Sequence, residues 1–343
     1  MVTDGLSGME TTLVRCIMSK ILVTGATGFT GGHLCKRLVE NGEQVVAFVR
    51  GSSNTKVLEE LGVECRVVDI RDPQSVNEHF VDIDRVYHIA AAWRSEHADR
   101  EEFHRVNVGA TRNLLEAAKA ANVKCFVHCS TVGVQGDIDN PPADEEYRFQ
   151  PGDHYQETKL EGELLAREYF ADGLRGAVFR PVGIYGPGDT RFLKLFRPIN
   201  KGTFVIIGSG KTLYHMTYID DLIDGIILVG TREEAIGEVF TLAGGEYTTL
   251  KELVNSVADA MNKPHPWLRI PFYPVFLASI VCDRVCRTLG IEPVLYPRRV
   301  EFFYKDRAFD INKAKRLLGY QPKVSLQEGL KKTAEWYRKE GLI

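Results

Sequence analysis

Short apolar runs rich in β-branched residues alternate along the first half of the chain with longer segments whose apolar residues recur every three or four positions. The first pattern is typical of buried strands and the second of amphipathic helices. We expect strands at residues 20–24, 44–49, 64–68, 85–89, 124–129 and 176–180. We expect helices between them at residues 31–41, 54–61, 73–80, 101–121 and 155–171. This alternation predicts an α/β fold with a doubly wound parallel sheet, covered by helices on both faces.

The pattern changes after Arg180, where prolines and glycines crowd into residues 181–188 and predict an irregular loop. We expect a smaller, mostly C-terminal α/β lobe that binds a substrate. The expected division is a tail at 1–18, a Rossmann-type sheet domain at 19–185 plus 219–245, and a lobe at 186–218 plus 246–343. The second part of the sheet domain would return a helix and a strand to the sheet.

A glycine-rich turn follows the first expected strand directly, in Gly25-Ala-Thr-Gly28-Phe-Thr-Gly31. Glycines let the backbone turn sharply and approach a pyrophosphate, and the helix that follows offers free N–H groups at its positive end. The spacing differs by one residue from the commoner dinucleotide fingerprint. Its position between a strand and a helix still predicts a dinucleotide site.

The second expected strand ends at Arg50, where NAD-binding proteins often carry a carboxylate for the adenosine ribose. A guanidinium can instead pair with a 2′-phosphate. We therefore expect NADP(H) to be favoured over NAD(H). The alternative is a solvated arginine at a strand end.

Tyr155-Gln-Glu-Thr-Lys159 places a tyrosine and a lysine on one face of an expected helix. A free tyrosine is a poor base near neutrality, and a cation within a few ångströms favours its phenolate form. Tyr155 would then exchange a proton with an alcohol or carbonyl. Ser130 and Thr131 follow the fifth expected strand, at the carboxyl edge where such sheets bind ligands. One of these hydroxyls can polarise the same substrate oxygen, although both could simply cap the strand end.

Composition is that of an ordinary soluble protein, with 44% hydrophobic and 26% charged residues. The net charge of −3 predicts no binding to nucleic acid or to an anionic membrane. The seven cysteines, an odd number spread along the chain, favour reduced thiols and a cytoplasmic protein. Cys125, His128 and Cys129 resemble metal ligands, but strand alternation places His128 on the other face, so no metal is expected. No run is long enough to span a bilayer, and residues 270–289 suggest an apolar helix near a membrane or an apolar substrate.

These features together resemble the extended short-chain dehydrogenase/reductase family, also called the NAD-dependent epimerase/dehydratase family. The resemblance covers about residues 19–343 and adds His88-Ile-Ala-Ala-Ala92, Arg180-Pro-Val-Gly-Ile-Tyr-Gly-Pro-Gly188, Tyr218-Ile-Asp-Asp221 and Leu318-Gly-Tyr-Gln-Pro322. It implies an enzyme in which Thr131, Tyr155 and Lys159 are catalytic, supported by Asn107. Two long helices, 101–121 and 155–171, would form a homodimer interface.

The resemblance also implies which residues surround the ligands. Cofactor-binding residues would be Gly25, Thr27, Gly28, Phe29, Thr30, Gly31, Arg50, Asp69, Ile70, Ala90, Ala91, Ala92, Tyr155, Lys159, Pro181 and Ile184. Substrate-binding residues would be Trp93, Thr131, Val132, Tyr185 and His215.

Two departures from the family pattern bear on the substrate. Members that act on nucleotide-diphosphate sugars usually carry an arginine just before Tyr218-Ile-Asp-Asp221, where this chain has His215. A tyrosine common after the fifth strand is Gln135 here. The apolar segment 266–296 is closer to the 3β-hydroxysteroid dehydrogenase and dihydroflavonol-reductase-like branches. We therefore expect an oxidoreductase that interconverts an alcohol and a ketone on a hydrophobic or ring-shaped small molecule. The alternatives are a nucleotide-sugar epimerase or dehydratase with tightly bound NAD, and a non-catalytic NAD(P) sensor.

Overall fold

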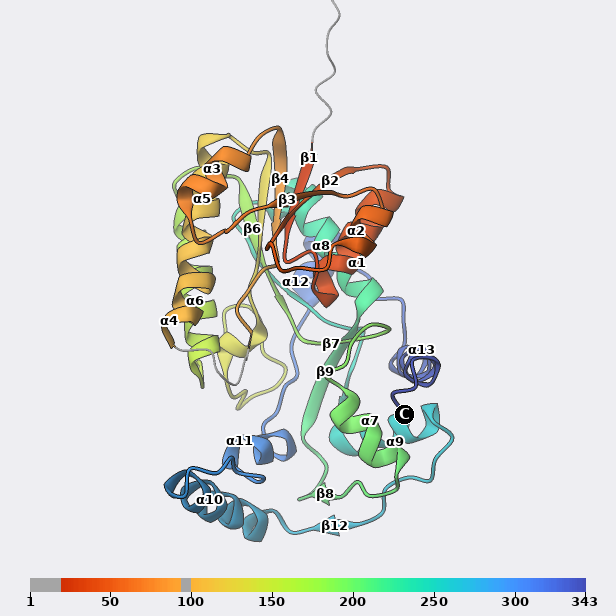
Figure 1. The fold of residues 1–343 in the computed structure, drawn as a ribbon. Coiled ribbons are helices and arrows are strands. Elements are labelled where there is room, and N and C mark those ends of the chain that lie inside the picture. Colours follow the sequence, from red (N-terminus) through yellow and green to blue (C-terminus); the bar gives the residue numbers. More distant parts are fainter. Residues whose placement is uncertain (1–19, 94–99) are drawn as a thin grey trace, which may run out of the picture.

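The computed structural model describes residues 20–93 and 100–343, so the tail expected at 1–18 lies outside the described residues. Seven parallel strands form the main sheet, in the order β10-β6-β5-β4-β1-β2-β3 (Figure 1). They are β1 (Lys20–Thr24), β2 (Gln44–Val49), β3 (Glu64–Val67), β4 (Ile83–His88), β5 (Cys125–Cys129), β6 (Gly176–Pro181) and β10 (Val239–Leu242). The predicted doubly wound parallel sheet is confirmed.

Helices cover both faces of this sheet, because side chains at alternate positions of a strand enter different cores. Ile21 and Val23 belong to one apolar cluster, whereas Leu22 belongs to the other. The first face is covered by α1 (Phe29–Glu40), α2 (Lys56–Glu60), α8 (Ile219–Thr231) and α12 (Asn312–Leu318). The second face is covered by α3 (Pro73–His79), α5 (Ala110–Ala120) and α6 (His154–Ala171). The helix and strand expected from 219–245 are α8 and β10.

The prediction of one continuous α-helix over 101–121 is wrong in its first half. Helix α4 (Arg100–His104) leads into a π-helical turn at Arg105–Gly109, and α5 begins only at Ala110. The apolar repeat could not reveal this turn, because the cause is tertiary. The side chain of Asn107 bonds the loop after β4, and its carbonyl accepts the Thr111 hydroxyl at 2.8 Å. Such π-turns inside α-helices are frequent at functional sites.

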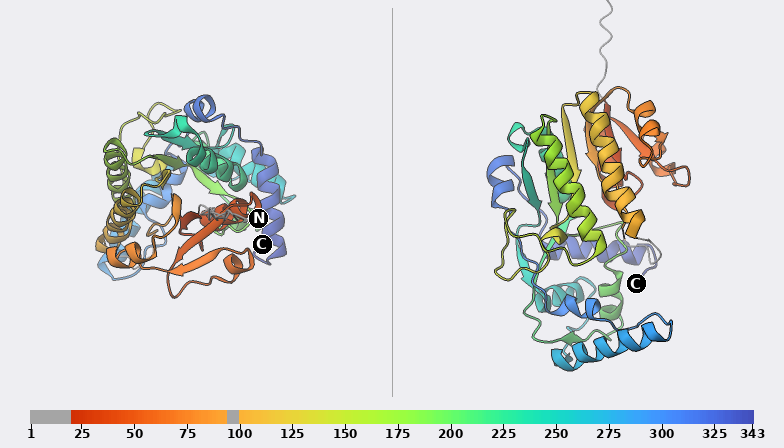
Figure 2. Two further views of the ribbon diagram at one scale, coloured as in Figure 1. Left: turned by 90° about the horizontal axis from the view of Figure 1, so that it is seen from above. Right: turned by 90° about the vertical axis from the view of Figure 1, so that its left-hand side faces the viewer.

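The remaining elements form a lobe beyond the carboxyl edge of the main sheet (Figures 1 and 2). Its strands are β7 (Gly183–Tyr185), β9 (Leu213–Tyr218) and β11 (Tyr247–Thr249) in one sheet, with β8 (Ile206–Ile207) and β12 (Arg269–Ile270) in another. Its helices are α7 (Leu193–Asn200), α9 (Leu250–Ala260), α10 (Phe272–Thr288), α11 (Pro297–Val300) and α13 (Leu326–Lys339). The lobe also contains the short helical turn η4 (Glu301–Phe303), whereas the turns η2 (Val132–Gln135), after β5, and η3 (Glu233–Ala235), between α8 and β10, belong to the sheet domain. Helix α12 returns to pack on β10 and α8.

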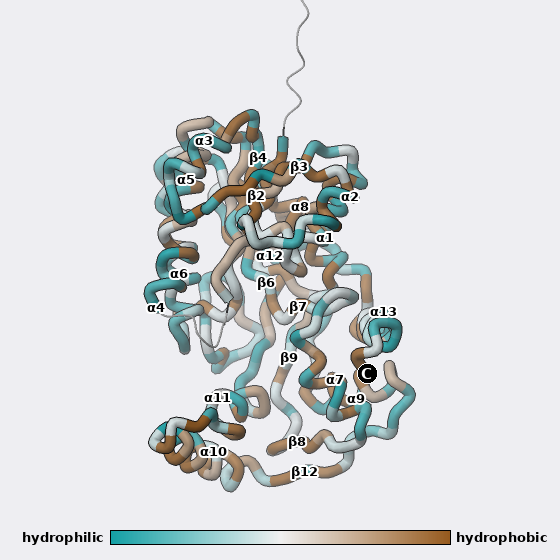
Figure 3. The backbone as a smooth tube through the Cα atoms, viewed as in Figure 1, coloured by the Kyte–Doolittle hydropathy of each residue, from teal (hydrophilic) through white to brown (hydrophobic). Residues whose placement is uncertain are grey.

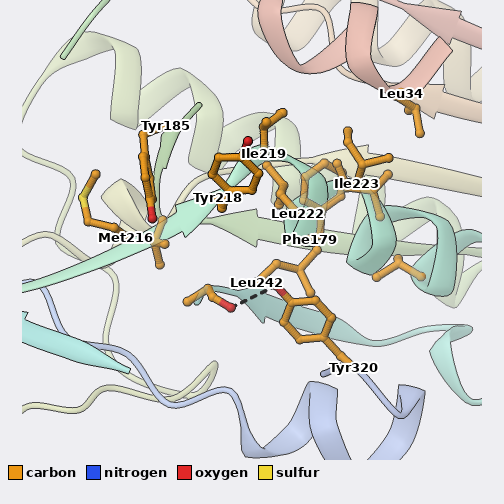
Figure 4. Close-up of a cluster of buried hydrophobic side chains, with 14 of the residues drawn as sticks. Leu34, Phe179, Tyr185, Met216, Tyr218, Ile219, Leu222, Ile223, Leu242 and Tyr320 are labelled. Atoms are coloured by element: carbon orange, nitrogen blue, oxygen red, sulfur yellow. Dashed lines mark hydrogen bonds between the residues drawn. The ribbon is translucent and has the colours of Figure 1, made fainter. Parts of the chain in front are cut away.

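A single apolar core joins the sheet domain to the lobe (Figure 4). Tyr185 of β7 and Tyr218 of β9 meet edge to face, with ring centroids 5.7 Å apart. Beside them, Leu242 belongs to the main sheet, and the Tyr320 hydroxyl donates to the carbonyl of Ala243 at 2.9 Å. This continuous packing fixes the lobe over the carboxyl ends of the strands.

The described cysteines are free thiols: Cys35 and Cys125 are buried, and the other four are partly exposed. Within residues 20–93 and 100–343, no helix is both long and apolar enough to cross a membrane.

Candidate active site

The loops that follow β1, β4, β5 and β6 meet along one edge of the main sheet, because these strands are parallel and adjacent. Helix α1 after β1 and the helices after β4 lie on different faces of the sheet. In doubly wound sheets such a change of side creates a crevice at the carboxyl edge, where ligands bind. Thr131 and many of the predicted cofactor residues lie directly after these strands. Tyr155 and Lys159 lie farther on, in helix α6.

The turn after β1 leaves no space for a side chain at Gly25 or at Gly31. Gly25 has φ +72°, and a Cβ there would lie 2.8 Å from the nitrogen of Ala90. A Cβ on Gly31 would lie 2.2 Å from the carbonyl oxygen of Gly25. Gly28 begins α1 with no side-chain cap, and Thr27 and Gly28 are exposed. The turn therefore presents a helix N-terminus that fits the pyrophosphate of a dinucleotide.

Gly31→Ala is expected to lower the free energy of unfolding by about 1–3 kcal/mol, because the added methyl group has no space. It should also weaken NAD(P)H binding, since the turn must open to admit the methyl. Urea unfolding and a fluorescence titration with NADPH measure the two effects. Gly32→Ala is the matched control, because its Cβ would lie 3.3 Å from the nearest atom, the Ala26 oxygen. Equal stability and affinity in both variants would contradict the prediction.

Two buried side chains that sequence reasoning missed hold this turn against the loop after β4. The Thr24 hydroxyl accepts from Ala90 N at 3.2 Å and bonds His88 Nδ1 at 2.8 Å. His88 Nε2 lies 2.9 Å from the Thr111 hydroxyl. Burial lowers the pKa of His88 to about 3, so the ring is neutral and works as a hydrogen-bond bridge. The available signal was the position of Thr24 and His88 as the last residues of adjacent strands.

Asn107 connects three parts of the site through its buried amide. Its Oδ1 accepts from Ala92 N at 2.8 Å, and its Nδ2 donates to the Thr158 hydroxyl at 3.0 Å. Thr158 directly precedes Lys159 on α6. A Cβ on Gly162 of the same helix would lie 2.5 Å from the backbone carbonyl oxygen of Asn107, so the π-helical turn and α6 are in close contact. Asn107 therefore positions the loop at Ala92 relative to α6.

Helix α6 places Tyr155 and Lys159 one turn apart at the end of β5. The helix begins after Asp153, whose carboxylate caps it by accepting from Gln156 N at 2.7 Å. Lys159 is 3% exposed, and its Nζ donates to the carbonyl of Cys129 at 2.5 Å. Burial lowers the pKa of Lys159 below its usual range. Tyr155 is half-buried, and its ring meets that of Phe103 at a centroid distance of 6.5 Å.

The two hydroxyls after β5 have different surroundings. Ser130 is buried, and its Oγ donates to Glu163 Oε2 at 2.5 Å. Thr131 is partly exposed, begins the turn η2 that contains Val132, and accepts from Gly133 N at 3.1 Å. The structure thus engages Ser130 in the protein interior and leaves Thr131 as the hydroxyl at the crevice.

Beneath these hydroxyls lies a fully buried ion pair that the sequence did not single out. Arg180 donates from Nε and Nη2 to the two carboxylate oxygens of Glu163 at 3.0 and 2.6 Å. Neither side chain is exposed. The pair joins β6 to α6, and through Ser130 to β5. The pair therefore connects the three elements that carry the candidate catalytic residues and their neighbours.

Arg191 is a further residue that sequence reasoning missed. Its Nη2 donates to the carbonyl of Ile184 at 3.0 Å, and its Nε donates to Asp189 at 2.5 Å. Its guanidinium lies 5.4 Å from the ring centroid of Phe29 and 6.0 Å from that of Trp93. It therefore brings together the glycine turn, the loop after β4 and the segment after β6. The only sequence signal was an arginine in a loop rich in proline and glycine.

The two substrate-binding candidates of the lobe, His215 and Tyr185, are both buried and bond backbone groups. His215 is buried, and its Nε2 and Nδ1 bond the backbone of Gly244 and Phe309 at 2.9 and 3.4 Å. Tyr185 is 2% exposed and its hydroxyl donates to the Leu326 carbonyl at 3.5 Å. A hollow of about 320 Å³ beside Tyr185 is lined by neither Tyr155 nor Thr131. The candidate catalytic residues therefore do not line this hollow.

The outer cofactor candidates follow β2 and β3. Arg50 is exposed at the end of β2, the strand next to β1. Asp69 is exposed and binds the guanidinium of Arg71 at 2.8 Å, which lowers the pKa of its carboxyl. Ile70 is partly buried, and its carbonyl accepts from Asn113 at 3.0 Å. In the part of the chain that the structure describes, no group of three or more His, Cys, Asp or Glu side chains is placed to hold a metal ion.

Comparison with known proteins agrees with this arrangement. The profile of the "NAD dependent epimerase/dehydratase family" matches residues 21–243. The chain is 30% identical to a 2-alkyl-3-oxoalkanoate reductase of Stenotrophomonas maltophilia, over 91% of this chain and 98% of that protein. It is 31% identical to a 3β-hydroxysteroid dehydrogenase/Δ5→4-isomerase of Mycobacterium tuberculosis, over 93% and 90%. Among solved structures, a UDP-glucuronic acid 4-epimerase of Bacillus cereus in complex with NAD matches with a TM-score of 0.73 and 27% identity, over 94% and 99%.

Proposed function

The chain belongs to the NAD-dependent epimerase/dehydratase family of enzymes, and we propose that it interconverts an alcohol and a ketone on a hydrophobic or ring-shaped small molecule. The observation that carries the proposal is the buried Lys159, which is fixed to the end of β5 one helical turn from Tyr155. Two relatives named as a reductase and a hydroxysteroid dehydrogenase support this class of reaction.

In the proposed mechanism, the glycine turn would hold a nicotinamide cofactor, whose chemistry would be the gain or loss of a hydride. Tyr155 gives its hydroxyl proton to the carbonyl oxygen, or takes the proton from the alcohol in the reverse direction. Lys159 places a positive charge near this hydroxyl, and Thr131 donates a hydrogen bond to the same oxygen. Asn107 is a positioning residue, because its amide holds Ala92 and Thr158 around the site.

The proposed substrate binds between the sheet edge and the lobe, with Trp93 and Val132 at the crevice. A coupled assay of NADPH oxidation with sterol, terpenoid and flavonoid-like ketones tests the proposal. Turnover of these ketones is expected, whereas UDP- and GDP-sugars should remain unchanged. Activity on the nucleotide sugars alone would overturn the proposal.

A nucleotide-sugar epimerase is the second candidate, since the epimerase of Bacillus cereus has a similar fold. His215 argues against it, because both of its ring nitrogens bond backbone groups and burial lowers its pKa, so this ring supplies no positive charge where such enzymes carry an arginine. An epimerase would retain NAD through purification and work without added cofactor, so analysis of the nucleotide released on denaturation separates the two candidates.

We propose that NADP(H) is preferred, because Arg50 stands at the end of β2 where a carboxylate would favour NAD(H). Arg50→Glu is expected to raise the KM for NADPH about 10–100-fold, since a charge-assisted bond to the 2′-phosphate is lost and a repulsion is added. The KM for NADH should stay within about threefold. Steady-state kinetics with both cofactors measure this. Lys36→Glu on α1 is the charge-matched control, and an equal effect on both cofactors would contradict the prediction.

We further propose a cytoplasmic homodimer that pairs through α4, α5 and α6. These helices lie side by side on one face of the sheet, joined by an ion pair between Lys119 and Asp172 (Figure 2). Leu164 of α6 is exposed on their outer surface. Light scattering of the purified protein tests the assembly.

A further inference from the structure

Exposed apolar side chains concentrate at the end of the lobe remote from the main sheet. Figure 3 shows α10 at this end of the lobe, with hydrophobic residues interspersed with hydrophilic ones. We call it the α10 surface, which consists of Trp267, Leu268, Tyr273, Leu277, Ile280, Val281, Val285, Leu289, Ile291 and Val294. Trp267 is 85% exposed and Leu277 is 62% exposed. An apolar cluster of this kind on a soluble surface marks an interaction site.

Helix α10 packs on the lobe through one face and leaves the other uncovered. Phe272 and Phe276 meet the ring of Tyr304 at centroid distances of 5.1 and 6.3 Å. Among its residues only Ser279 is fully buried. Tyr273, Leu277 and Arg284 follow one another at helical spacing on the opposite, exposed face. The exposed face of α10 therefore carries apolar side chains together with Arg284.

Charge around the α10 surface differs in sign from that of the whole chain. Residues 263–299 contain six lysines and arginines and two acidic residues, whereas the complete chain has a net charge of −3. Lys263, Arg269, Arg284 and Arg287 are exposed. The overall charge balance therefore conceals a local positive region, which is why composition alone predicted no anionic membrane.

We propose that the α10 surface binds the surface of an anionic lipid bilayer, with α10 lying parallel to it. Apolar side chains that enter the headgroup region next to lysines and arginines are the features of a helix that rests on a membrane. Exposed Trp267 and Tyr273 are of the type that settles at such an interface. Symmetric pairing with a second copy is disfavoured, because it would bring the two positive regions together. The helix also holds Asp283, Arg284 and Arg287, which suits lying on a bilayer and not crossing it.

Vesicle sedimentation tests the proposal with the full-length protein. Binding is expected to vesicles of phosphatidylcholine mixed with phosphatidylserine, to fall as salt rises, and to be weak with phosphatidylcholine alone. Arg284→Gln and Arg287→Gln should each weaken it about fivefold. The double variant Leu277→Glu/Val281→Glu should weaken it at least about tenfold. Val57→Glu, an equally exposed apolar position on α2, is the control that should bind normally.

Tryptophan fluorescence gives an independent readout, since the chain has three tryptophans. A blue shift on adding anionic vesicles is expected in the parent protein and should disappear in Trp267→Phe. Thermal melting of each variant shows that it remains folded. Absence of binding, or equal binding by parent and Leu277→Glu/Val281→Glu, would overturn the proposal, as would a dimer that this variant alone dissociates. The experiment uses neither cofactor nor substrate, so its result is independent of the proposed reaction.

Discussion

Tyr155→Phe is expected to lower kcat at least about 100-fold while NAD(P)H binding stays the same, because only the phenolic proton is removed. The ring keeps its packing against Phe103, and the lysine keeps its bond to the Cys129 carbonyl. The loss should appear in kcat and in kcat/KM alike, as for an interaction made chiefly in the transition state. Steady-state and single-turnover kinetics measure the loss of activity, and a cofactor titration on the same sample measures the affinity for NAD(P)H.

Tyr169→Phe is the matched control for this experiment. Tyr169 lies on the same helix, and its hydroxyl bonds Glu116 at 3.3 Å, away from the crevice. It should retain nearly full activity. If Tyr155→Phe were as active as Tyr169→Phe, the proposed proton transfer would be wrong. If neither the parent nor the variants turned over any substrate yet all bound NAD(P)H, the non-catalytic sensor would become the better interpretation.

The sequence predicted the sheet well, because its signals are local. Inner parallel strands such as β1 and β6 are buried on both faces and therefore form short apolar runs, whereas the edge strand β3 is largely exposed. The glycine turn marks the end of β1. Strand 44–49 has the predicted bounds, and predicted strand 64–68 ends one residue earlier. The return of a helix and a strand from residues 219–245 to the sheet was also predicted, and these elements are α8 and β10.

The connections that organise the site could not be predicted in the same way, because they join residues far apart in the sequence. The π-helical turn depends on the contact of Asn107 with Ala92, which no helical repeat records. Ser130 and Thr131 look equivalent in the sequence, and only the position of Glu163 separates them. The sequence predicts His215 as a substrate-binding residue, but only the structure shows that both of its ring nitrogens bond backbone groups.

The resemblance to a family therefore supplied the residue types of the site, and the structure supplied their support. Thr24, His88 and Thr111 form a chain of hydrogen bonds next to the glycine turn. The neutral imidazole at its centre follows from burial, which disfavours the charged form. Catalytic side chains keep their productive geometry only when the residues around them hold them in place. Substitution of a supporting residue should therefore lower stability and activity together.

Arg180→Met is expected to lower the free energy of unfolding by about 3–5 kcal/mol, because it leaves the buried carboxylate of Glu163 without its main partner. Both side chains are fully buried, and Arg180 also donates to the carbonyl of Glu145 at 2.9 Å. Removing one charge in a medium of low polarity exposes the full cost of burying the other. Urea unfolding of the purified variant measures the loss, and activity should fall with it because Ser130 depends on Glu163.

Two further variants show whether the loss arises from the unpaired charge. Arg180→Met combined with Glu163→Leu should recover part of the stability, since a buried ion pair can often be replaced by apolar side chains. Arg175→Met breaks a pair with Glu233 that has a similar distance, 2.6 Å, but lies on the surface. It should cost at most about 1 kcal/mol. If the surface and the buried variants lost the same stability, or if the double variant were less stable than Arg180→Met, the unpaired charge of Glu163 would not be the cause of the loss.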